Sequence, residues 1–432
     1  MGKRWLTSVW RAGWLGAAGL FAAGAAAFAA TNPPIYVTIV MHSEQGSPYH
    51  SNPILFEANR TNLYRFAKGL SEIGAKFNFQ SDWTFLAGVT NFDFGARPET
   101  GGTNIVAWMQ NDLGFEIDPH NHVGGSVYNY ADVAALAAAC GAKPTALVGG
   151  FVAYPPESNE WPTLQGTLTG AVFAAFTWTP RALWGASSKN HADDTNLWFS
   201  GVYCPAGTNA FWTHAAGNLP IVGGYGGRNE VFLNLDRLLA RRDLGLLCTG
   251  SLYTVNLMAN MSAMDDAYIA NFLARASFYT NVPNLRFVTL GQLTNVWATE
   301  YGAAPFYYPW EMDRDVDADE MDDGWEVTNF CGIAEAGAGS DFDEDRQSDR
   351  DEYVAGTSPT DPGARFELIA ENGRGETVWT AVTGRIYEVE VEAGGVWTTA
   401  GYCVTGAAPL HVWTNPFIAP TSSWCRVRAR MP

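Results

Sequence analysis

The sequence predicts an α/β protein: an irregular (β/α) barrel, followed by an acidic calcium-loop spacer and a small C-terminal all-β module. Three observations support this fold class. Short β-rich runs alternate with helical stretches from Ile35 to about Glu300, Asp and Glu concentrate between Glu311 and Asp361, and alternating β-type sequence begins near Arg365. The 432 residues, 47% of them hydrophobic, suffice for one large core and a smaller one, because single cores stop growing near roughly 250–300 residues.

The barrel is predicted from the spacing of its apolar runs. Strands are expected over residues 35–41, 76–80, 115–118, 219–222, 246–255 and 285–290, and helices over 55–73, 105–113, 130–140, 230–242, 264–279 and 292–300. This alternation indicates βα units around a parallel sheet. Residues 153–216, rich in Trp, Gly and Pro, are expected to be long loops, which are usually functional or insertional in a compact domain.

The first thirty residues have the pattern of a bacterial export signal. Lys3, Arg4 and Arg11 accompany an apolar run over residues 15–27, and Ala27-Phe28-Ala29 offers small residues at the cleavage spacing. A retained membrane anchor is the alternative, but the run is short for a bilayer span and no later stretch is long and apolar enough. We therefore expect a secreted, periplasmic or cell-surface protein with no integral membrane segment after signal removal.

These signals divide the chain into a signal peptide over residues 1–30, a barrel domain over 31–309, a tandem calcium-loop spacer over 310–362 and a β-module over 363–432. The net charge of -18 is concentrated in the spacer. Between Glu311 and Asp361, 18 acidic residues stand against three Arg, a balance of -15. The rest of the chain is close to neutral and has no dense basic patch, which argues against a nucleic-acid partner.

Two acidic runs repeat the same offsets. In a twelve-residue loop, positions 1, 3, 5, 9 and 12 are occupied first by Asp315, Asp317, Asp319, Asp323 and Glu326, and then by Asp341, Asp343, Asp345, Asp349 and Glu352. Calcium takes six to eight oxygen ligands, and this spacing wraps carboxylates around one ion, with the final Glu able to bind through both oxygens. The sequence therefore predicts two calcium sites, with a disordered acidic linker as the alternative.

Position 6 of each loop departs from the usual pattern, because Glu320 and Arg346 stand where a Gly normally permits the sharp turn. The stretches over residues 321–326 and 351–359 resemble thrombospondin type 3 and dockerin-like calcium repeats of secreted bacterial proteins. The resemblance implies a rigid, calcium-dependent spacer and says nothing of the chemistry upstream.

A second candidate site lies at the predicted strand ends, where reactive residues gather in parallel βα folds. The ends carry His42, Ser43 and Glu44, then Gln80, Ser81 and Asp82, then Asp118, His120, Asn121 and His122. Residues i and i+2 of an extended segment project to the same side, so His120 and His122 can share a metal ion. His42 is a further candidate ligand, and Glu44, Asp82 or Asp118 could be the third ligand or the general base. The donors suit a divalent, zinc-like metal without deciding its identity.

The segment Gly114-Phe115-Glu116-Ile117-Asp118-Pro119-His120 resembles the metal motif of the polysaccharide deacetylase (NodB-like) family, within the glycoside hydrolase and deacetylase barrel superfamily. Residues 287–290 resemble that family's final strand. The resemblance implies an irregular (β/α) barrel and a metal-dependent hydrolase with a polysaccharide substrate. The family's second His falls at Gly124, so His122 would substitute for it. His42-Ser43-Glu44 replaces the family's Asp-Asp pair, and the late catalytic His has no clear counterpart.

The leading hypothesis is a secreted, metal-dependent hydrolase acting on a carbohydrate, possibly associated with the cell surface. Loop tryptophans suit stacking on sugars or core packing equally well: Trp161, Trp178, Trp184, Trp198 and Trp212. The alternatives are a non-catalytic carbohydrate-binding or surface-adhesion protein with a degenerate barrel, and a metallo-amidohydrolase-like enzyme. Export permits disulfides, and among the six cysteines Cys403 and Cys425 are the favoured pair because both lie in the β-module.

Overall fold

The computed structural model describes residues 6–8, 32–44, 46–95, 97–122, 126–153, 157–186, 199–224, 231–309, 315, 317–333, 336–372, 376–382, 385–393, 396–404, 410–414 and 425–431. The chain divides into two compact units. We call Ala30–Glu311 the α/β unit, and Met1–Ala29 together with Met312–Pro432 the acidic-loop unit. No helix among the described residues is long and apolar enough to cross a membrane.

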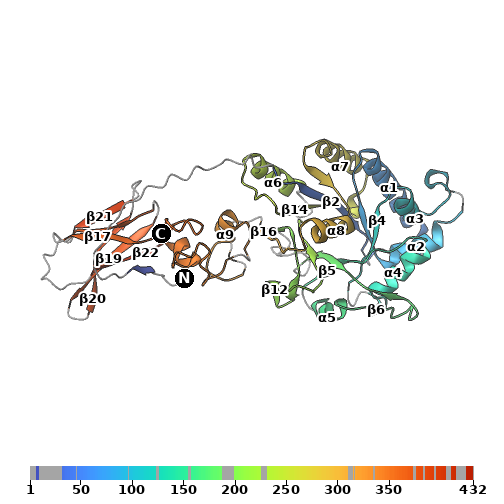
Figure 1. Ribbon diagram of the computed structural model, residues 1–432. Helices are drawn as coiled ribbons and strands as arrows, with labels where there is room; N and C mark the ends of the chain where they lie inside the picture. The colour runs from blue at the N-terminus through green and yellow to red at the C-terminus, as the bar shows by residue number, and fades with distance from the viewer. Residues whose placement is uncertain are drawn as a thin grey trace. The chain divides into compact units, whose positions relative to one another are not determined.

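The α/β unit is built around parallel strands (Figure 1). One sheet has the order β14 (Tyr253–Ala259), β2 (Ile35–His42), β3 (Asn78–Ser81) and β4 (Glu116–Pro119), and β15 (Leu285–Phe287) also pairs with β2. Every pairing in this sheet is parallel. All eight residues of β2 are buried, which explains its continuous apolar sequence, since parallel strands are covered on both faces.

A second sheet continues the arrangement with β5 (Leu147–Val152), β8 (Ala182–Ala186), β13 (Ile221–Val222) and β10 (Val202–Tyr203). The β5–β8 and β8–β13 pairings are parallel, and β10 is antiparallel. Several contacts link these two sheets. They include a bridge between His120 and Gly149, an Asn256 N–H to Gly224 oxygen bond of 2.8 Å, and a bond of 2.7 Å from the Thr254 hydroxyl to the Gly223 oxygen. The predicted α/β class with parallel pairing is confirmed, but the described parallel strands belong to two separate sheets and do not form one continuous closed barrel.

Helices cover the sheets on the outside (Figure 1). They are α1 (Pro53–Glu72), α2 (Trp83–Phe92), α3 (Ile105–Asn111), α4 (Tyr130–Ala139), α5 (Trp161–Leu164), α6 (Leu233–Asp243), α7 (Asp266–Tyr279) and α8 (Leu290–Glu300). The α1 side chain Phe66 packs edge-on against Phe77 before β3 and Phe272 of α7, with ring centroids 5.6 and 5.1 Å apart. Aromatic packing of this kind joins the helix layer to the sheet.

Several elements differ from the sequence expectation. The strand expected over residues 246–255 is β14, which begins only at Tyr253. Helix α2 and strands β5 and β8 were not predicted. The region expected to be long loops contains short strands, namely β6 (Leu168–Thr169), β7 (Thr177–Trp178), β9 (Phe199–Ser200), β11 (Pro205–Gly207) and β12 (Ala210–His214), while β16 (Tyr308–Pro309) pairs with β9.

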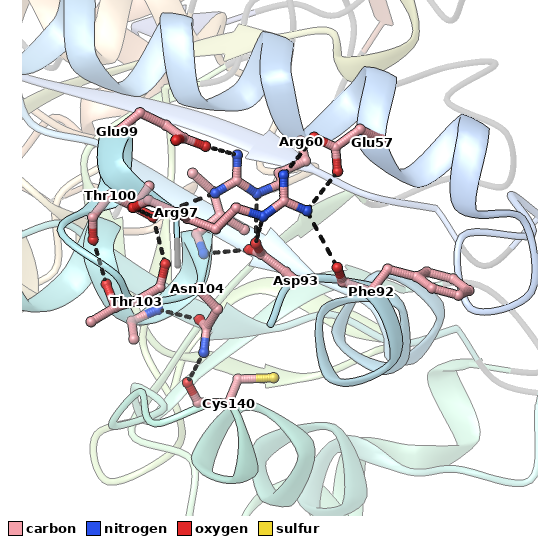
Figure 2. Close-up of polar contacts among 12 residues, drawn as sticks. Glu57, Arg60, Phe92, Asp93, Arg97, Glu99, Thr100, Thr103, Asn104 and Cys140 are labelled. Atoms are coloured by element: carbon pink, nitrogen blue, oxygen red, sulfur yellow. Dashed lines mark hydrogen bonds and ion pairs between the residues drawn. The ribbon is translucent and has the colours of Figure 1, made fainter. Parts of the chain in front are cut away.

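A buried network of ion pairs and hydrogen bonds joins α1 to the connection between α2 and α3 (Figure 2). Arg60, only 1% exposed, donates from Nε to Asp93 at 2.7 Å and from Nη1 to Glu99 at 2.8 Å. The other Asp93 oxygen accepts from the Ile105 N–H at 2.6 Å. Arg97 adds a contact of 3.4 Å to Asp93. Because each buried charge here has partners, the network serves packing, and we assign it no ligand.

The acidic-loop unit contains two short helices and a β-module. The helices are α9 (Asp323–Phe330) and α10 (Asp349–Ala355). The strands are β1 (Leu6–Ser8), β17 (Leu368–Asn372), β18 (Glu376–Thr380), β19 (Ile386–Ala393), β20 (Val396–Val404), β21 (Leu410–Thr414) and β22 (Cys425–Arg430), in two antiparallel sheets of order β1-β22-β19-β20 and β17-β18-β21. Strand β1 lies within the expected signal peptide, at the edge of its sheet.

The strand register separates the favoured cysteine pair. Cys403 of β20 lies opposite Tyr387 of β19, whereas Cys425 of β22 lies opposite Val391 on the other side of β19. Two strand spacings alone amount to about 9.5 Å, which exceeds the roughly 7 Å limit between the Cα atoms of a disulfide. The Cys403–Cys425 expectation is therefore wrong. Cys140 and Cys204 are buried free thiols.

Candidate metal centres

Three histidines surround Glu44 at the carboxyl ends of β2 and β4. His42 is the last residue of β2, and His120 directly follows β4. The Glu44 carboxylate lies 3.1 Å from His42 Nε2, 3.8 Å from His120 Nε2 and 3.6 Å from His122 Nε2. We call these four residues the histidine cluster. Ligand atoms about 2.1 Å from a tetrahedral ion lie roughly 3.4 Å apart. Ligand atoms of His42, Glu44 and His120 all lie within 4.8 Å of one another, which suits a shared cation, whereas His122 is not grouped with them.

The cluster has a buried inner side and an open outer side. His120 is fully buried and the His42 side chain is 8% exposed, whereas those of His122 and Glu44 are 29% and 46% exposed. Neither ring nitrogen of His120 has a hydrogen-bond partner among the described residues. A buried, unpaired polar atom is costly, and coordination of a metal by a ring nitrogen would remove that cost. The donor set fits a metal on this ground.

The protonation states also suit a cation. Burial lowers the pKa of His120 to about 4, and the charges of His42 and His122 add to the effect despite the opposing effect of the nearby Glu44 carboxylate. Burial alone would raise the pKa of Glu44, but its interactions with His120 and His42 hold that pKa below the ordinary value. At neutral pH the cluster thus offers a neutral imidazole at His120 and an ionised carboxylate at Glu44, the forms that bind metals.

Two consecutive glycines of β5 allow close approach to the end of β4, and Gly150 makes room for the His120 ring. A Cβ on Gly150 would overlap that ring, and one on Gly149 would lie 2.9 Å from the Pro119 carbonyl oxygen. Gly150 also has φ +75°, in the left-handed region that L side chains rarely adopt. The Gly-Gly pair inside an apolar run is a sequence signal for close backbone approach, and it was not used to predict this site.

Asp82, a predicted catalytic residue, is the N-cap of α2. Its carboxylate accepts from the Thr84 and Phe85 N–H groups, both at 3.2 Å, and from the Thr84 hydroxyl at 2.6 Å. The Ser43 hydroxyl also donates to Asp82, and the Asp82 N–H donates back to it at 3.0 Å. Asp82 therefore caps a helix and bonds to Ser43, the residue between His42 and Glu44, and its role as ligand or base stays a prediction.

Asp118, the other predicted catalytic carboxylate, faces a buried polar network. It accepts from Thr145 Oγ1 at 2.6 Å and from Asn78 Nδ2 at 2.9 Å, and it is 1% exposed. Burial and the nearby charge of Glu116 raise its pKa to about 8. Asp118 is not grouped with His42, Glu44 and His120 as a metal ligand, and its role as a base stays a prediction.

The tryptophans singled out in the sequence contribute mainly to packing. Trp161, Trp178 and Trp184 are 7%, 7% and 3% exposed. Trp184 lies edge-on to His42, with ring centroids 6.2 Å apart, and so supports the cluster from β8. Trp198 and the side chain of Trp212 lie outside the described part of the chain. A cavity of about 100 Å³ beside the cluster is lined by His42, Glu44, Tyr49, Met258 and Asn260, among others.

The two acidic loops have the same backbone construction. In the first, Asp315 accepts from the N–H groups of Asp319 and Glu320, both at 3.0 Å. In the second, Asp341 accepts from Asp345 and Arg346, at 3.0 and 2.9 Å. The position-6 residues Glu320 and Arg346 have φ of +82° and +81°. The turn therefore forms without its usual glycine, at the expense of left-handed backbone strain.

The final Glu of each loop is buried among carboxylates. Glu326 and Glu352 are both 0% exposed, and their carboxylate oxygens have no hydrogen-bond partners among the described residues. Glu326 lies within ligand distance of Asp317 and Asp323. Burial and the charges of neighbouring Asp residues raise the pKa of Glu326 to about 10 and that of Glu352 to about 8. Buried, unsatisfied oxygens in an all-oxygen donor set fit calcium.

No family model matches the chain, and no curated protein matches it. Solved structures match it at low identity. A protein assigned as a polysaccharide deacetylase from Mycobacterium smegmatis matches at 12% identity and TM-score 0.35, over 65% of this chain and 96% of that one.

Two further structures match at similar values. A 4-alpha-glucanotransferase from Thermococcus litoralis matches at 9% identity and TM-score 0.38, over 61% of this chain and 40% of that one. A variant of a peptidoglycan deacetylase from Bacillus subtilis matches at 12% identity and TM-score 0.27, over 63% and 95%. Similarities this distant leave the function to be argued from the site itself.

Proposed function

We propose that the α/β unit is a metal-dependent hydrolase acting on a carbohydrate, with its metal held by the histidine cluster. The observation that carries the proposal is His120, a fully buried imidazole with neither ring nitrogen hydrogen-bonded among the described residues, beside the ionised Glu44. His42 and His120 would be the inner ligands. Glu44 would be the third donor, and the more exposed His122 contacts Glu44 on the outer side of the cluster.

A divalent ion bound there would supply a Lewis acid and a hydrolytic nucleophile competent near neutral pH. Glu44 has two carboxylate oxygens, so one can bind the ion while the other accepts a proton from an attacking water at the edge of the cavity, where the side chain is half-exposed. The cavity of about 100 Å³ is small beside the roughly 300–1,000 Å³ of usual ligand pockets. It therefore suits a small reacting group, such as an acyl substituent, with the rest of a glycan outside.

The test combines metal analysis with an assay for acetate released from acetylated oligosaccharides. In the full chain loaded with zinc, the double variant His120→Ala/His122→Ala is expected to lose one bound metal per chain and at least about 100-fold in hydrolysis. His50→Ala, a half-buried histidine outside the cluster, is the matched control and should keep both. Unchanged metal content in the double variant would contradict the proposal. Metal bound without hydrolysis would favour the non-catalytic binding protein.

We also propose that the acidic loops bind one calcium ion each. The ligands in the first loop would be Asp315, Asp317, Asp319, Asp323 and Glu326, and in the second Asp341, Asp343, Asp345, Asp349 and Glu352. The buried, unsatisfied carboxylates of Glu326 and Glu352 support this. Calorimetric titration of the full chain should find two sites, and Glu326→Gln should remove or weaken one. The absence of calcium binding would contradict it.

A further inference from the structure

The second acidic loop is hydrogen-bonded to the first residues of the β-module. Gln347 at loop position 7 donates from Nε2 to the Phe366 carbonyl at 3.0 Å, and its Oε1 accepts from the Phe366 N–H at 3.2 Å. Phe366 is 4% exposed and stacks on Tyr387 of β19, with ring centroids 5.6 Å apart. A side chain of the loop therefore holds the backbone of a core residue of the module.

A second link runs through a proposed calcium ligand. Arg365 Nη1 donates to the Asp345 carbonyl at 3.3 Å, and its Nε lies 3.7 Å from the Asp345 carboxylate. That carboxylate is 1% exposed. The geometry of loop position 5 is thus tied to the residue that precedes Phe366.

Helix α10, which carries the final ligand Glu352, is part of the module's core. Ala355 is 1% exposed and belongs to the apolar cluster that contains Trp379, Tyr387 and Val389. Arg385, just before β19, donates to the Val354 and Tyr353 carbonyls at 2.8 and 2.9 Å. The carbonyl groups at the end of the helix are therefore satisfied by the module.

The first loop is connected to the second one. Glu320 forms an ion pair of 2.5 Å with Arg350 of α10, and Trp325 contacts the ring of Tyr353 at 5.2 Å between centroids. Both of these contacts join the first loop to α10. The first loop therefore reaches the module core through α10, whereas the second loop contacts it directly through Gln347 and Arg365.

We propose that the second loop is an integral part of the β-module, and that its calcium ion is a structural ion that orders the module's core. This inference rests on the calcium sites proposed above. The two loops then have different roles despite identical ligand offsets. Calcium in the second loop orders the core of the β-module, and calcium in the first loop stiffens the segment before the second loop. The like charges around Glu352 oppose folding of the loop without calcium, and the three links transmit that effect to Phe366 and α10.

The test is hydrogen exchange of the full chain, followed in peptides from β19 and β22, in saturating calcium and in chelator. Calcium is expected to slow exchange in these peptides at least about tenfold in the wild type, because it favours the folded state alone. Glu352→Gln should abolish the calcium-dependent protection. Glu326→Gln, the matched change in the first loop, should retain it.

Gln347→Ala separates calcium binding by the second loop from the effect of that calcium on the β-module. This variant keeps the loop carboxylates, so titration should still find two calcium sites, while the protection of β19 and β22 should decrease. Two calcium ions bound with unchanged exchange in wild-type β19 and β22 would overturn the inference and leave the calcium sites standing. Equal loss of protection in Glu326→Gln and Glu352→Gln would also overturn it. If titration finds no calcium binding, the calcium proposal itself fails.

Discussion

The histidine cluster and the acidic loops are both candidate metal sites, but their charges are arranged in opposite ways. In the histidine cluster, a neutral imidazole and an ionised carboxylate contact each other without repulsion, and the pKa of His120 falls to about 4. In the loops, only carboxylates meet, and the pKa of Glu326 rises to about 10 through burial and repulsion by the Asp residues. The first site is formed by packing, whereas the second needs a cation to offset its own charge.

This difference has a consequence for the metal-free protein. The histidine cluster lies on strand ends and against Gly149–Gly150, so the α/β unit keeps its fold when the metal is removed. The acidic loops have no comparable support, and their folding is linked to calcium. Removal of metals is therefore expected to abolish hydrolysis by the α/β unit without unfolding it, and to destabilise the acidic-loop unit.

The largest effect is expected for a substitution that displaces the His120 ring, and it tests whether packing positions the histidine cluster. In Gly150→Ala, the new Cβ overlaps the His120 ring, and we expect metal binding at the cluster to weaken by about 100-fold, as for other changes that misplace a ligand. Gly74→Ala is the control, because Gly74 has nearly the same φ, +74°, with nothing within 4 Å of the added Cβ. Equal zinc affinities of the two variants, measured by competitive titration, would show that the glycine does not position His120.

Chelation of calcium is the next largest effect. At free calcium 100 times the dissociation constant, each site stabilises the folded state by about 2.7 kcal/mol. Chelation should lower the unfolding temperature of the acidic-loop unit and leave that of the α/β unit unchanged. Differential scanning calorimetry checks this, with magnesium as the control ion. Equal shifts of both units on chelation would remove the contrast between the two regions.

The pH dependence sharpens the same contrast. In calcium-free protein, the folded pKa values of Glu326 and Glu352, about 10 and 8, lie above the ordinary 4.5, so their contribution to stability is present below pH 4.5 and is lost as pH rises. We expect the acidic-loop unit to lose stability from about pH 4.5 to 8. Denaturant unfolding at several pH values measures this, and bound calcium should abolish the slope.

In the α/β unit, two shifts oppose each other. The lowered pKa of His120 contributes stability that is present above about pH 6.5 and lost toward pH 4, whereas the raised pKa of Asp118 contributes stability that is lost from about pH 4 to 8. Between pH 4.5 and 6.5 the free energy of unfolding should therefore change less with pH for the α/β unit than for the acidic-loop unit. A steeper slope there than in the acidic-loop unit would contradict the assignment.

The smallest effect concerns the loop turn. Arg346 has φ +81°, and an L residue in this left-handed region costs roughly 1–2 kcal/mol. Gly avoids that strain, but it loses more backbone entropy on folding, which offsets part of the gain. Arg346→Gly is expected to raise the free energy of unfolding by about 1 kcal/mol. Glu320→Gly, with φ +82°, also loses the ion pair with Arg350 and should gain less. Equal or reversed gains in denaturant titrations would show that the turn is not strained.

The sequence could predict the histidine cluster because the strand ends of a parallel sheet converge, which brings His42, Glu44 and His120 together. It could not predict the direction of each carboxylate. Asp82 turns away because α2 begins at the next residue and needs an N-cap. Asp118 lies beside Gln80 in the strand register and bonds to Asn78 and Thr145 inside the unit. Neither fact follows from spacing along one strand.

The acidic segment shows the same limit. Repeated Asp offsets predict two like loops, and the hydrogen bonds of Asp315 and Asp341 have the same pattern. The different surroundings of the loops depend on two residues. Gln347 bonds to Phe366, 19 residues further along the chain, and Ala355 packs in a cluster with Trp379, Tyr387 and Val389. Long-range packing of this kind leaves no periodic signal in the sequence.

Anomalous diffraction at the zinc edge, from crystals of the full chain grown with both zinc and calcium, tests the central claim most directly. We expect a zinc peak about 2.0–2.2 Å from donor atoms of His42, Glu44 and His120, and no zinc peak within either acidic loop. A zinc peak confined to the acidic loops, with none at the histidine cluster, would contradict it.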